Sequence, residues 1–210
     1  MRHHLTLFPT NVFVEDSFEL PDEERKKIYN HHSDLRKVPN HYGNISSTSS
    51  VTENRLLAPY PTIENLIINQ FKKIIREELD YHQDFQLVTS WIMKVPPGGF
   101  TQPHVHKNSY YAGVYYYDEY VRDSGSLELE SPLIPFSDFY LTPKKWNFKT
   151  DLSIEIPAQK NHLVFFPAHI RHTVLVNQTN KDRYSLVFNI VPLGEYGDTD
   201  SSYSTDWIKK

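Results

Sequence analysis

Cysteine is absent from this 210-residue chain. Its absence excludes disulfides, zinc–thiolate sites, iron–sulfur clusters and cysteine nucleophiles, so imidazole and carboxylate groups are the remaining metal ligands. Long apolar runs are missing too. No stretch reaches the roughly 18 residues of a membrane helix, and Met1–Leu5 lacks the apolar core and cleavage site of a signal peptide. We therefore expect a soluble, intracellular protein.

An excess of charge of one sign is also missing. The formal net charge is −4, from 22 lysine and arginine residues and 26 aspartate and glutamate residues. Such a chain has no broad cationic field of the kind that attracts nucleic acid or anionic lipid. We expect neither nucleic acid nor a membrane as a partner.

The first part of the chain carries mostly helical signals. Leu5–Asp16 is β-branched and aromatic but contains a proline, which predicts an edge strand. Residues 20–32 place acids before cations, as a short helix favours. Residues 39–61 are polar, which predicts a long loop that is either functional, as a cover over a site, or disordered. Over residues 63–79, apolar side chains recur at helical spacing behind Thr62 as N-cap, which predicts an amphipathic helix on a sheet.

After Asp80 the apolar pattern changes to that of β-strands. Seven short aromatic or β-branched segments follow one another, separated by proline, glycine, asparagine and aspartate. Their even spacing predicts a mainly β fold, an antiparallel jelly roll with flanking helices packed on its outside. The segments are 85–95, 109–120, 125–131, 152–157, 162–167, 172–178 and 183–193.

One domain accounts for the whole chain, since its length allows one substantial core. We expect an N-terminal strand and supporting helices over 1–82, the jelly-roll core over 83–195 and a C-terminal tail over 196–210.

Two of the eleven histidines stand one residue apart, His104 and His106. In a strand, residues i and i+2 project to the same face, so both imidazoles point to one spot. His172 begins a later strand and is the candidate third ligand. His169 and His162 are weaker candidates, because both fit loop positions. Three ligands on one side of an ion leave other positions open, which indicates chemistry rather than a structural site.

A cation follows this third histidine at a defined distance. Arg183 lies 11 residues after His172, across the turn "NQTNKD", and Ser185 shares its face of the strand. A guanidinium beside a hydroxyl forms a fork for a carboxylate, at a separation from the metal that suits a short dicarboxylate. Lys181 has the same parity and is the second candidate for this contact.

Five motifs in order, "HVH", "GVYYY", "GSLELESP", "LVFFPAHIRHTV" and "RYSLVFNI", resemble the 2-oxoglutarate- and Fe(II)-dependent dioxygenases. The similarity is to a prolyl-hydroxylase-like group of oxygenases found in phages and bacteria, and it extends to "LFPTNVFV" and "GDTDSSY". It implies a double-stranded β-helix and Fe(II) held by the three histidines. It also implies 2-oxoglutarate as a cosubstrate that chelates the metal, with Arg183 and Ser185 on its distal carboxylate.

The same resemblance implies O2 as the second cosubstrate and hydroxylation of a substrate, with succinate and CO2 as by-products. By family analogy the substrate class is a prolyl residue or another protein side chain. We expect a cytoplasmic location. If a phage encodes the protein, this is the cytoplasm of the host cell.

Position 106 departs from the superfamily pattern, in which an aspartate or glutamate is the usual second residue of the pair. A histidine there leaves the site one charge more positive. Three interpretations follow: a three-histidine oxygenase, a site completed by Asp118, Glu128 or another carboxylate, or a non-catalytic or degenerate metal-binding jelly-roll module. The group it resembles carries H-x-H itself, which favours the first. An isomerase or sugar-binding cupin is a further alternative and would form no succinate.

Aromatic residues supply the remaining candidates. Tyr111, Tyr115 and Tyr117 share one parity on their strand, and Trp91 lies on another strand. We name Tyr115 as a candidate contact for the cosubstrate. The alternative for all of these side chains is an aromatic core.

Overall fold

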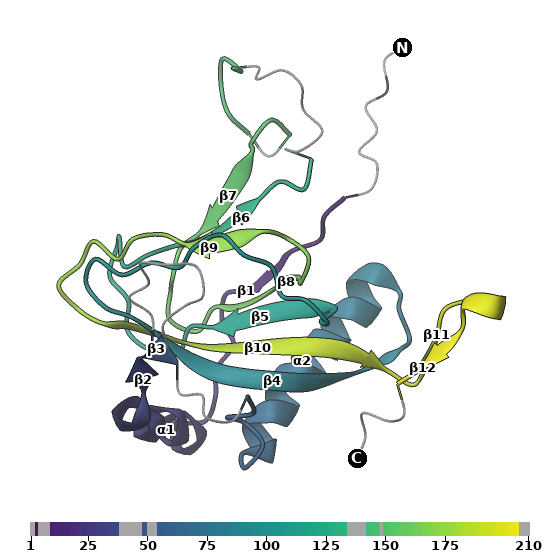
Figure 1. Ribbon diagram of the computed structural model, residues 1–210, viewed down its shortest axis with the longest axis horizontal. Coiled ribbons are helices and arrows are strands. Elements are labelled where there is room, and N and C mark those ends of the chain that lie inside the picture. Colours follow the sequence, from purple (N-terminus) through teal and green to yellow (C-terminus); the bar gives the residue numbers. More distant parts are fainter. Residues whose placement is uncertain are drawn as a thin grey trace.

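The computed structural model describes residue 3 and residues 9–37, 48–49, 54–133, 142–147 and 149–205. Two antiparallel sheets make up its body (Figure 1). The larger sheet has seven strands, in the order β1 (Phe13–Glu15), β8 (Leu163–Pro167), β5 (Tyr111–Tyr115), β10 (Arg183–Leu193), β4 (Asp84–Val95), β3 (Thr48–Ser49) and β2 (Arg36–Lys37). The smaller sheet has three, in the order β7 (Ser153–Ile156), β6 (Leu127–Glu130) and β9 (His172–Val174).

The predicted jelly roll is confirmed. Each of the seven segments expected after Asp80 contains one strand, from β4 to β10, and all ladders between these strands are antiparallel. In the larger sheet, β8, β5, β10 and β4 are neighbours although they are distant in sequence, which is the strand arrangement of a jelly roll.

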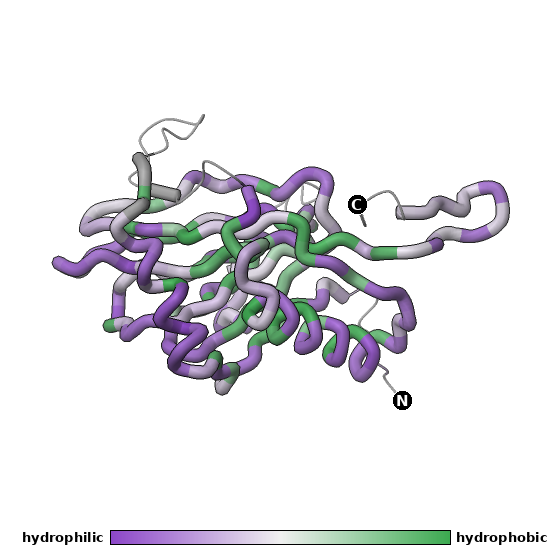
Figure 2. Tube along the Cα trace, turned by 90° about the horizontal axis from the view of Figure 1, so that it is seen from below, coloured by the Kyte–Doolittle hydropathy of each residue, from purple (hydrophilic) through white to green (hydrophobic). Residues whose placement is uncertain are grey.

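Two apolar cores lie on the two faces of the larger sheet. One lies between this sheet and the helix α2 (Pro61–Leu79), and includes Phe71, Phe165 and Phe188. The other lies inside the jelly roll and includes Val114 and Phe166. Figure 2 shows polar residues along the outer face of the helix and apolar residues along the strands. Central strands are therefore buried on both faces.

Gly113 of β5 lies directly against an aromatic side chain of the neighbouring strand. It is paired with Phe188 of β10, and a Cβ atom at this position would lie 2.3 Å from the Phe188 ring. A side chain here would displace a fully buried aromatic ring, so glycine is required within "GVYYY".

The helices occupy the predicted segments, with one corrected boundary. α1 (Asp22–Asn30) continues into the 3-10 turn η1 (His31–Asp34). The helix α2 begins at Pro61 behind Tyr60, so the expected cap at Thr62 is wrong by two residues. Proline suits the first helical position, because its fixed φ is already helical and its missing N–H would have no partner there.

The chain termini and the long polar segment differ in part from expectation. The predicted edge strand is reduced to β1, at the edge of the larger sheet, while residues 4–8 lie outside the described residues. Within the predicted loop 39–61, Thr48–Ser49 forms the short strand β3. Most of the remaining loop lies outside the described residues, so its role as a cover over a site stays a prediction.

The C-terminal region forms a hairpin. Its strands β11 (Glu195–Tyr196) and β12 (Tyr203–Ser204) flank the short 3-10 turn η3 (Thr199–Ser201), and Figure 1 shows it extending beyond the end of β10. Among the described residues, no helix is long and apolar enough to span a membrane.

Candidate metal and cosubstrate site

The structure brings the three predicted histidines together. His104 forms an isolated antiparallel bridge with His172, and their backbones exchange two hydrogen bonds of 2.9 and 3.0 Å. A ligand atom of each of these two imidazoles and one of His106 lie within 4.8 Å of one another. The Nε2 atoms of His104 and His106 are 3.3 Å apart. Three ring nitrogens therefore converge from two distant parts of the chain.

Main-chain carbonyls orient two of these rings. The Nδ1 of His104 is 2.8 Å from the carbonyl oxygen of Gln102, and the Nδ1 of His172 is 2.9 Å from that of Ile170. A carbonyl oxygen only accepts, so each Nδ1 carries the proton and each Nε2 keeps its lone pair. This is the tautomer that binds a metal through Nε2.

The third ring is oriented by a side chain. The Nδ1 of His106 is hydrogen-bonded to the amide oxygen of Asn189, which projects from β10. Trp91 of β4 lies on another side of this ring, with the two ring centroids 5.7 Å apart. The ring of His106 is thus fixed by neighbours from two strands of the larger sheet.

Burial keeps all three imidazoles neutral. It lowers the pKa of His104 and of His106, and it lowers the pKa of His172 to about 3, where repulsion from the protonated forms of the other two rings contributes further. Neutral imidazoles are ready to bind a cation without first losing a proton.

No carboxylate joins this group among the described residues. Asp118 accepts a hydrogen bond of 3.0 Å from Tyr29, and Glu128 accepts one of 2.7 Å from Ser153. The interpretation in which either residue completes the metal site is therefore wrong, and the cluster consists of imidazoles alone.

Arg183 is a buried cation at the start of β10, the strand that also carries Asn189. Only 3% of its surface is exposed, and in the described part of the chain it has no ion pair with a carboxylate. Its guanidinium donates to Ser185 at 3.5 Å and to the hydroxyl of Tyr116 at 3.1 Å, while its Nε has no partner. A buried charge without a counter-ion is costly, so this group is suited to an anionic ligand. The geometry fits a carboxylate, which a guanidinium binds through two parallel hydrogen bonds.

The tyrosine predicted to face the cosubstrate is on the wrong side of the sheet. Tyr115 packs in the core beneath α2, with its ring edge-on to Phe18 at 5.2 Å. Its neighbour Tyr116 faces the jelly-roll interior and contacts Arg183. Successive strand residues point to opposite faces, so an error of one residue reverses the assignment.

The weaker candidates lie elsewhere. His169 and Lys181 are exposed, and His162 lies 3.5 Å from the carboxylate of Asp16. None of these three belongs to the imidazole group.

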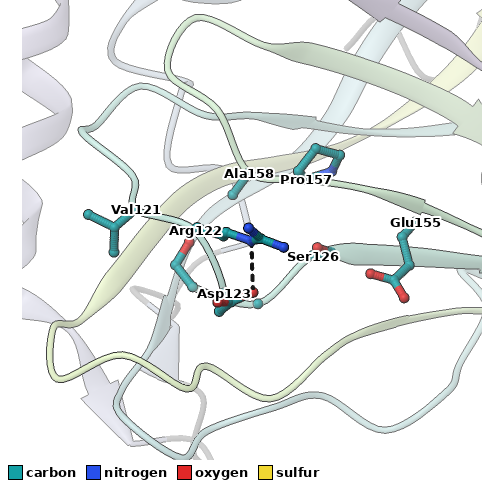
Figure 3. Close-up of a pocket in the computed structure, with 9 residues that line it drawn as sticks. Val121, Arg122, Asp123, Ser126, Glu155, Pro157 and Ala158 are labelled. Carbon is teal, nitrogen blue, oxygen red and sulfur yellow. Dashed lines mark ion pairs between the residues drawn. The ribbon is translucent and has the colours of Figure 1, made fainter.

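A separate pocket of about 300 Å³ lies beside the smaller sheet (Figure 3). It is lined by the loop 121–126 together with Glu155, Pro157 and Ala158, and Arg122 pairs with Asp123 there at 3.8 Å. Neither the three histidines nor Arg183 lines this pocket.

Comparison with known proteins identifies the class of chemistry. Residues 89–189, which include all three histidines and Arg183, match the family described as "Putative 2OG-Fe(II) oxygenase". No curated protein matches the chain.

Solved structures share the fold at low sequence identity. A 2OG-Fe(II) oxygenase family oxidoreductase from Burkholderia pseudomallei is 13% identical, with a TM-score of 0.59 over 85% of this chain and 83% of its own. A prolyl-4-hydroxylase from Pseudomonas putida is 17% identical, with a TM-score of 0.54 over 86% and 92%. HygX from Streptomyces hygroscopicus, solved with nickel, 2-oxoglutarate and hygromycin B, is 12% identical, with a TM-score of 0.58 over 87% and 83%.

The family match covers the segment that carries the imidazole group and the buried guanidinium, and the surrounding fold is the one that these oxygenases share. Residues 89–189 therefore match the 2-oxoglutarate- and Fe(II)-dependent oxygenases, and the protein is an oxidoreductase that uses Fe(II) with 2-oxoglutarate and O2.

Proposed function

We propose that this oxygenase hydroxylates a prolyl residue or another protein side chain, with Fe(II) held by His104, His106 and His172. In this proposal Arg183, Ser185 and Tyr116 bind the distal carboxylate of 2-oxoglutarate. Fe(II) and 2-oxoglutarate together supply the O2-dependent oxidation, in which the keto acid becomes succinate and CO2.

The ligand set supports the metal assignment. Three neutral imidazoles each present a ring nitrogen, and these nitrogens lie within 4.8 Å of one another. Three protein ligands would leave other coordination positions of an ion open for the cosubstrates. The chain's own contribution is to hold each ring in one tautomer, His104 and His172 through the carbonyls of Gln102 and Ile170 and His106 through the amide of Asn189.

The observation that carries the proposal is the unpaired guanidinium of Arg183 on the interior face of β10. It projects from the same strand face as Ser185, and its Nε has no partner among the residues that the structure describes. A metal-binding module without an anionic cosubstrate would have no use for a buried cation of this kind. 2-Oxoglutarate carries two carboxylates. In this proposal the carboxylate that does not bind the metal provides the negative charge that pairs with the Arg183 guanidinium.

The substrate class is proposed from the family resemblance and from the structural neighbours. One structural neighbour is a prolyl-4-hydroxylase, while another was solved with hygromycin B, which is not a protein. Peptides are therefore the first substrates to test, and hygromycin B is the comparison.

The experiment measures succinate. Metal-free protein is loaded with Fe(II), and 2-oxoglutarate is added in air, with and without a library of prolyl-containing peptides. We expect slow succinate formation that a suitable peptide accelerates, with hydroxylation detected as a mass increase of the peptide. Anaerobic Fe(II) and 2-oxoglutarate should also give a weak visible charge-transfer band, which His172→Ala should remove.

The outcomes separate the alternatives. Metal binding without the band and without succinate would contradict the proposal and indicate a non-catalytic module. Succinate formation that responds to small molecules and to no peptide would retain the oxygenase and overturn the substrate class. His169→Ala, at an exposed position outside the imidazole group, is the matched control and should behave as the wild type.

A further inference from the structure

We propose that Asn189, supported by Thr89, is a positioning residue that holds His106 in the Nδ1–H tautomer. In this role it allows an imidazole to take the ligand position that a carboxylate usually occupies. The inference rests on the proposed metal site.

Two hydrogen bonds connect these residues in a chain. The amide oxygen of Asn189 accepts from Nδ1 of His106, and its amide nitrogen donates to Oγ1 of Thr89 at 2.8 Å. The amide uses its oxygen for the ring and its nitrogen for the hydroxyl, so the ring nitrogen that faces it must carry hydrogen. Nε2 of His106 then keeps its lone pair, on the side where Nε2 of His104 lies 3.3 Å away.

His106 differs from its two companions in the source of this contact. His104 and His172 each bond the carbonyl two residues earlier in the chain, and no side-chain substitution removes a main-chain carbonyl. His106 depends on a side chain from β10, 83 residues away in sequence. A single substitution at position 189 therefore removes the orientation of one ligand and leaves the other two in place.

The sheet geometry explains how the two supporting residues meet. Asn189 and Thr89 are cross-strand partners of β10 and β4, and the register shifts immediately after this pair. Ile190 is paired with Leu87, so Val88 is the extra residue of a bulge. Bulges redirect side chains beside active sites, and this one lies at the pair that supports His106.

The neutral amide sets the charge of the site. A carboxylate hydrogen-bonded to the same ring nitrogen would draw its proton and make His106 a more basic ligand. Asparagine preserves the tautomer without adding a negative charge. Asn189→Asp should therefore keep the orientation, whereas Asn189→Ala should remove it.

The test uses metal-free full-length protein and Co(II) as the probe, without 2-oxoglutarate. We expect Asn189→Ala to weaken Co(II) binding by about 10- to 100-fold. Asn189→Asp should bind at least as tightly as the wild type. Thr89→Val should weaken binding by a smaller factor, and Thr89→Ser, which keeps the hydroxyl, should restore it.

A second readout is independent of metal and of turnover. Long-range ¹H–¹⁵N spectra of the metal-free protein should show His106 as the Nδ1–H tautomer in the wild type and as a mixture in Asn189→Ala. Thermal unfolding of each metal-free variant reports whether that variant folds. If Asn189→Ala or Thr89→Val does not fold, the conservative variants Asn189→Asp and Thr89→Ser are compared with the wild type instead.

Three results would overturn the inference. These are wild-type Co(II) affinity in Asn189→Ala, equal losses in Asn189→Asp and Asn189→Ala, or an Nε2–H tautomer of His106 in the wild type. A wild-type protein that binds no Co(II) would overturn the proposed metal site together with this inference. Wild-type protein that binds Co(II) but never forms succinate would contradict the proposed function alone.

Discussion

The guanidinium of Arg183 lies over the ring of Tyr116, with its Cζ 5.1 Å from the ring centroid, and it donates to the Tyr116 hydroxyl at 3.1 Å. The contact joins the first residue of β10 to the chain that follows β5. Because the hydroxyl accepts from arginine, its own hydrogen is left for an anionic ligand. The pair thus presents donors from two side chains to one position.

Arg183→Ala should abolish tight binding of 2-oxoglutarate. Removing one partner of a buried charge pair costs roughly 2–5 kcal/mol, which corresponds to a loss of affinity of about 30-fold or more. The anaerobic titration of Fe(II)-loaded protein with 2-oxoglutarate measures this loss through the charge-transfer band. Lys181→Ala is the matched control, since Lys181 is exposed near the same strand end. Equal behaviour of the two variants would contradict the role of Arg183.

Tyr116→Phe and Tyr115→Phe should differ although the residues are adjacent. Tyr116 contacts the guanidinium, whereas Tyr115 lies in the core beneath α2. A hydrogen bond to a charged group contributes roughly 1.5–3 kcal/mol, so the KM for 2-oxoglutarate should rise about tenfold or more in Tyr116→Phe.

Tyr115→Phe should leave the KM for 2-oxoglutarate unchanged. Steady-state succinate formation over a range of 2-oxoglutarate concentrations measures both variants. An increase in the Tyr115 variant alone would reverse the assignment of the two faces of β5.

The contrast between these tyrosines shows where sequence patterns lose information. Alternation identifies a buried face only when the other face is wet, and every residue of β5 is buried. The sequence pattern therefore predicted the strand correctly, but it could not show which side chains face α2 and which face the interior of the jelly roll. The seven strands after Asp80 and the turns between them were predictable, because proline, glycine, asparagine and aspartate separate them locally.

The histidines were predictable for a different reason. Residues 101–106 form no regular strand, only the bridge at His104, yet an i, i+2 pair in any extended segment projects to one side. The Asn189–Thr89 support was not predictable. It depends on the cross-strand register and on the bulge after this pair, and neither is encoded in a local pattern.

Metal-free protein should lose stability as the pH falls from about 6.5 toward 3. Burial lowers the pKa of His172 to about 3, whereas an unfolded histidine titrates near 6.5, so the unfolded chain binds the additional proton throughout this window. The contribution of His172 is present above the unfolded pKa and decreases as the pH falls. Between pH 7 and pH 5 it amounts to about 2 kcal/mol.

Urea unfolding at pH 7 and pH 5 measures this loss. His172→Phe should show a smaller decrease than the wild type, because the ring that must stay neutral is gone. His169→Ala should follow the wild type, since His169 is exposed. Equal pH dependence in the wild type and His172→Phe would contradict the assignment of the loss to His172.

Trp91 should report occupation of the metal site directly. Its ring centroid is 5.7 Å from that of His106, and the open d shell of Co(II) or Fe(II) opens a non-radiative path for an indole at such short range. The chain has three tryptophans, of which Trp146 is 43% exposed and Trp207 lies outside the described residues.

We expect Co(II) to quench part of the tryptophan emission of the metal-free protein. Trp91→Phe should remove that quenching, whereas Trp146→Phe should retain it. Zn(II), with a filled d shell, is the control ion and should quench little. Quenching that survives in Trp91→Phe would mean that the ion binds away from the three imidazoles.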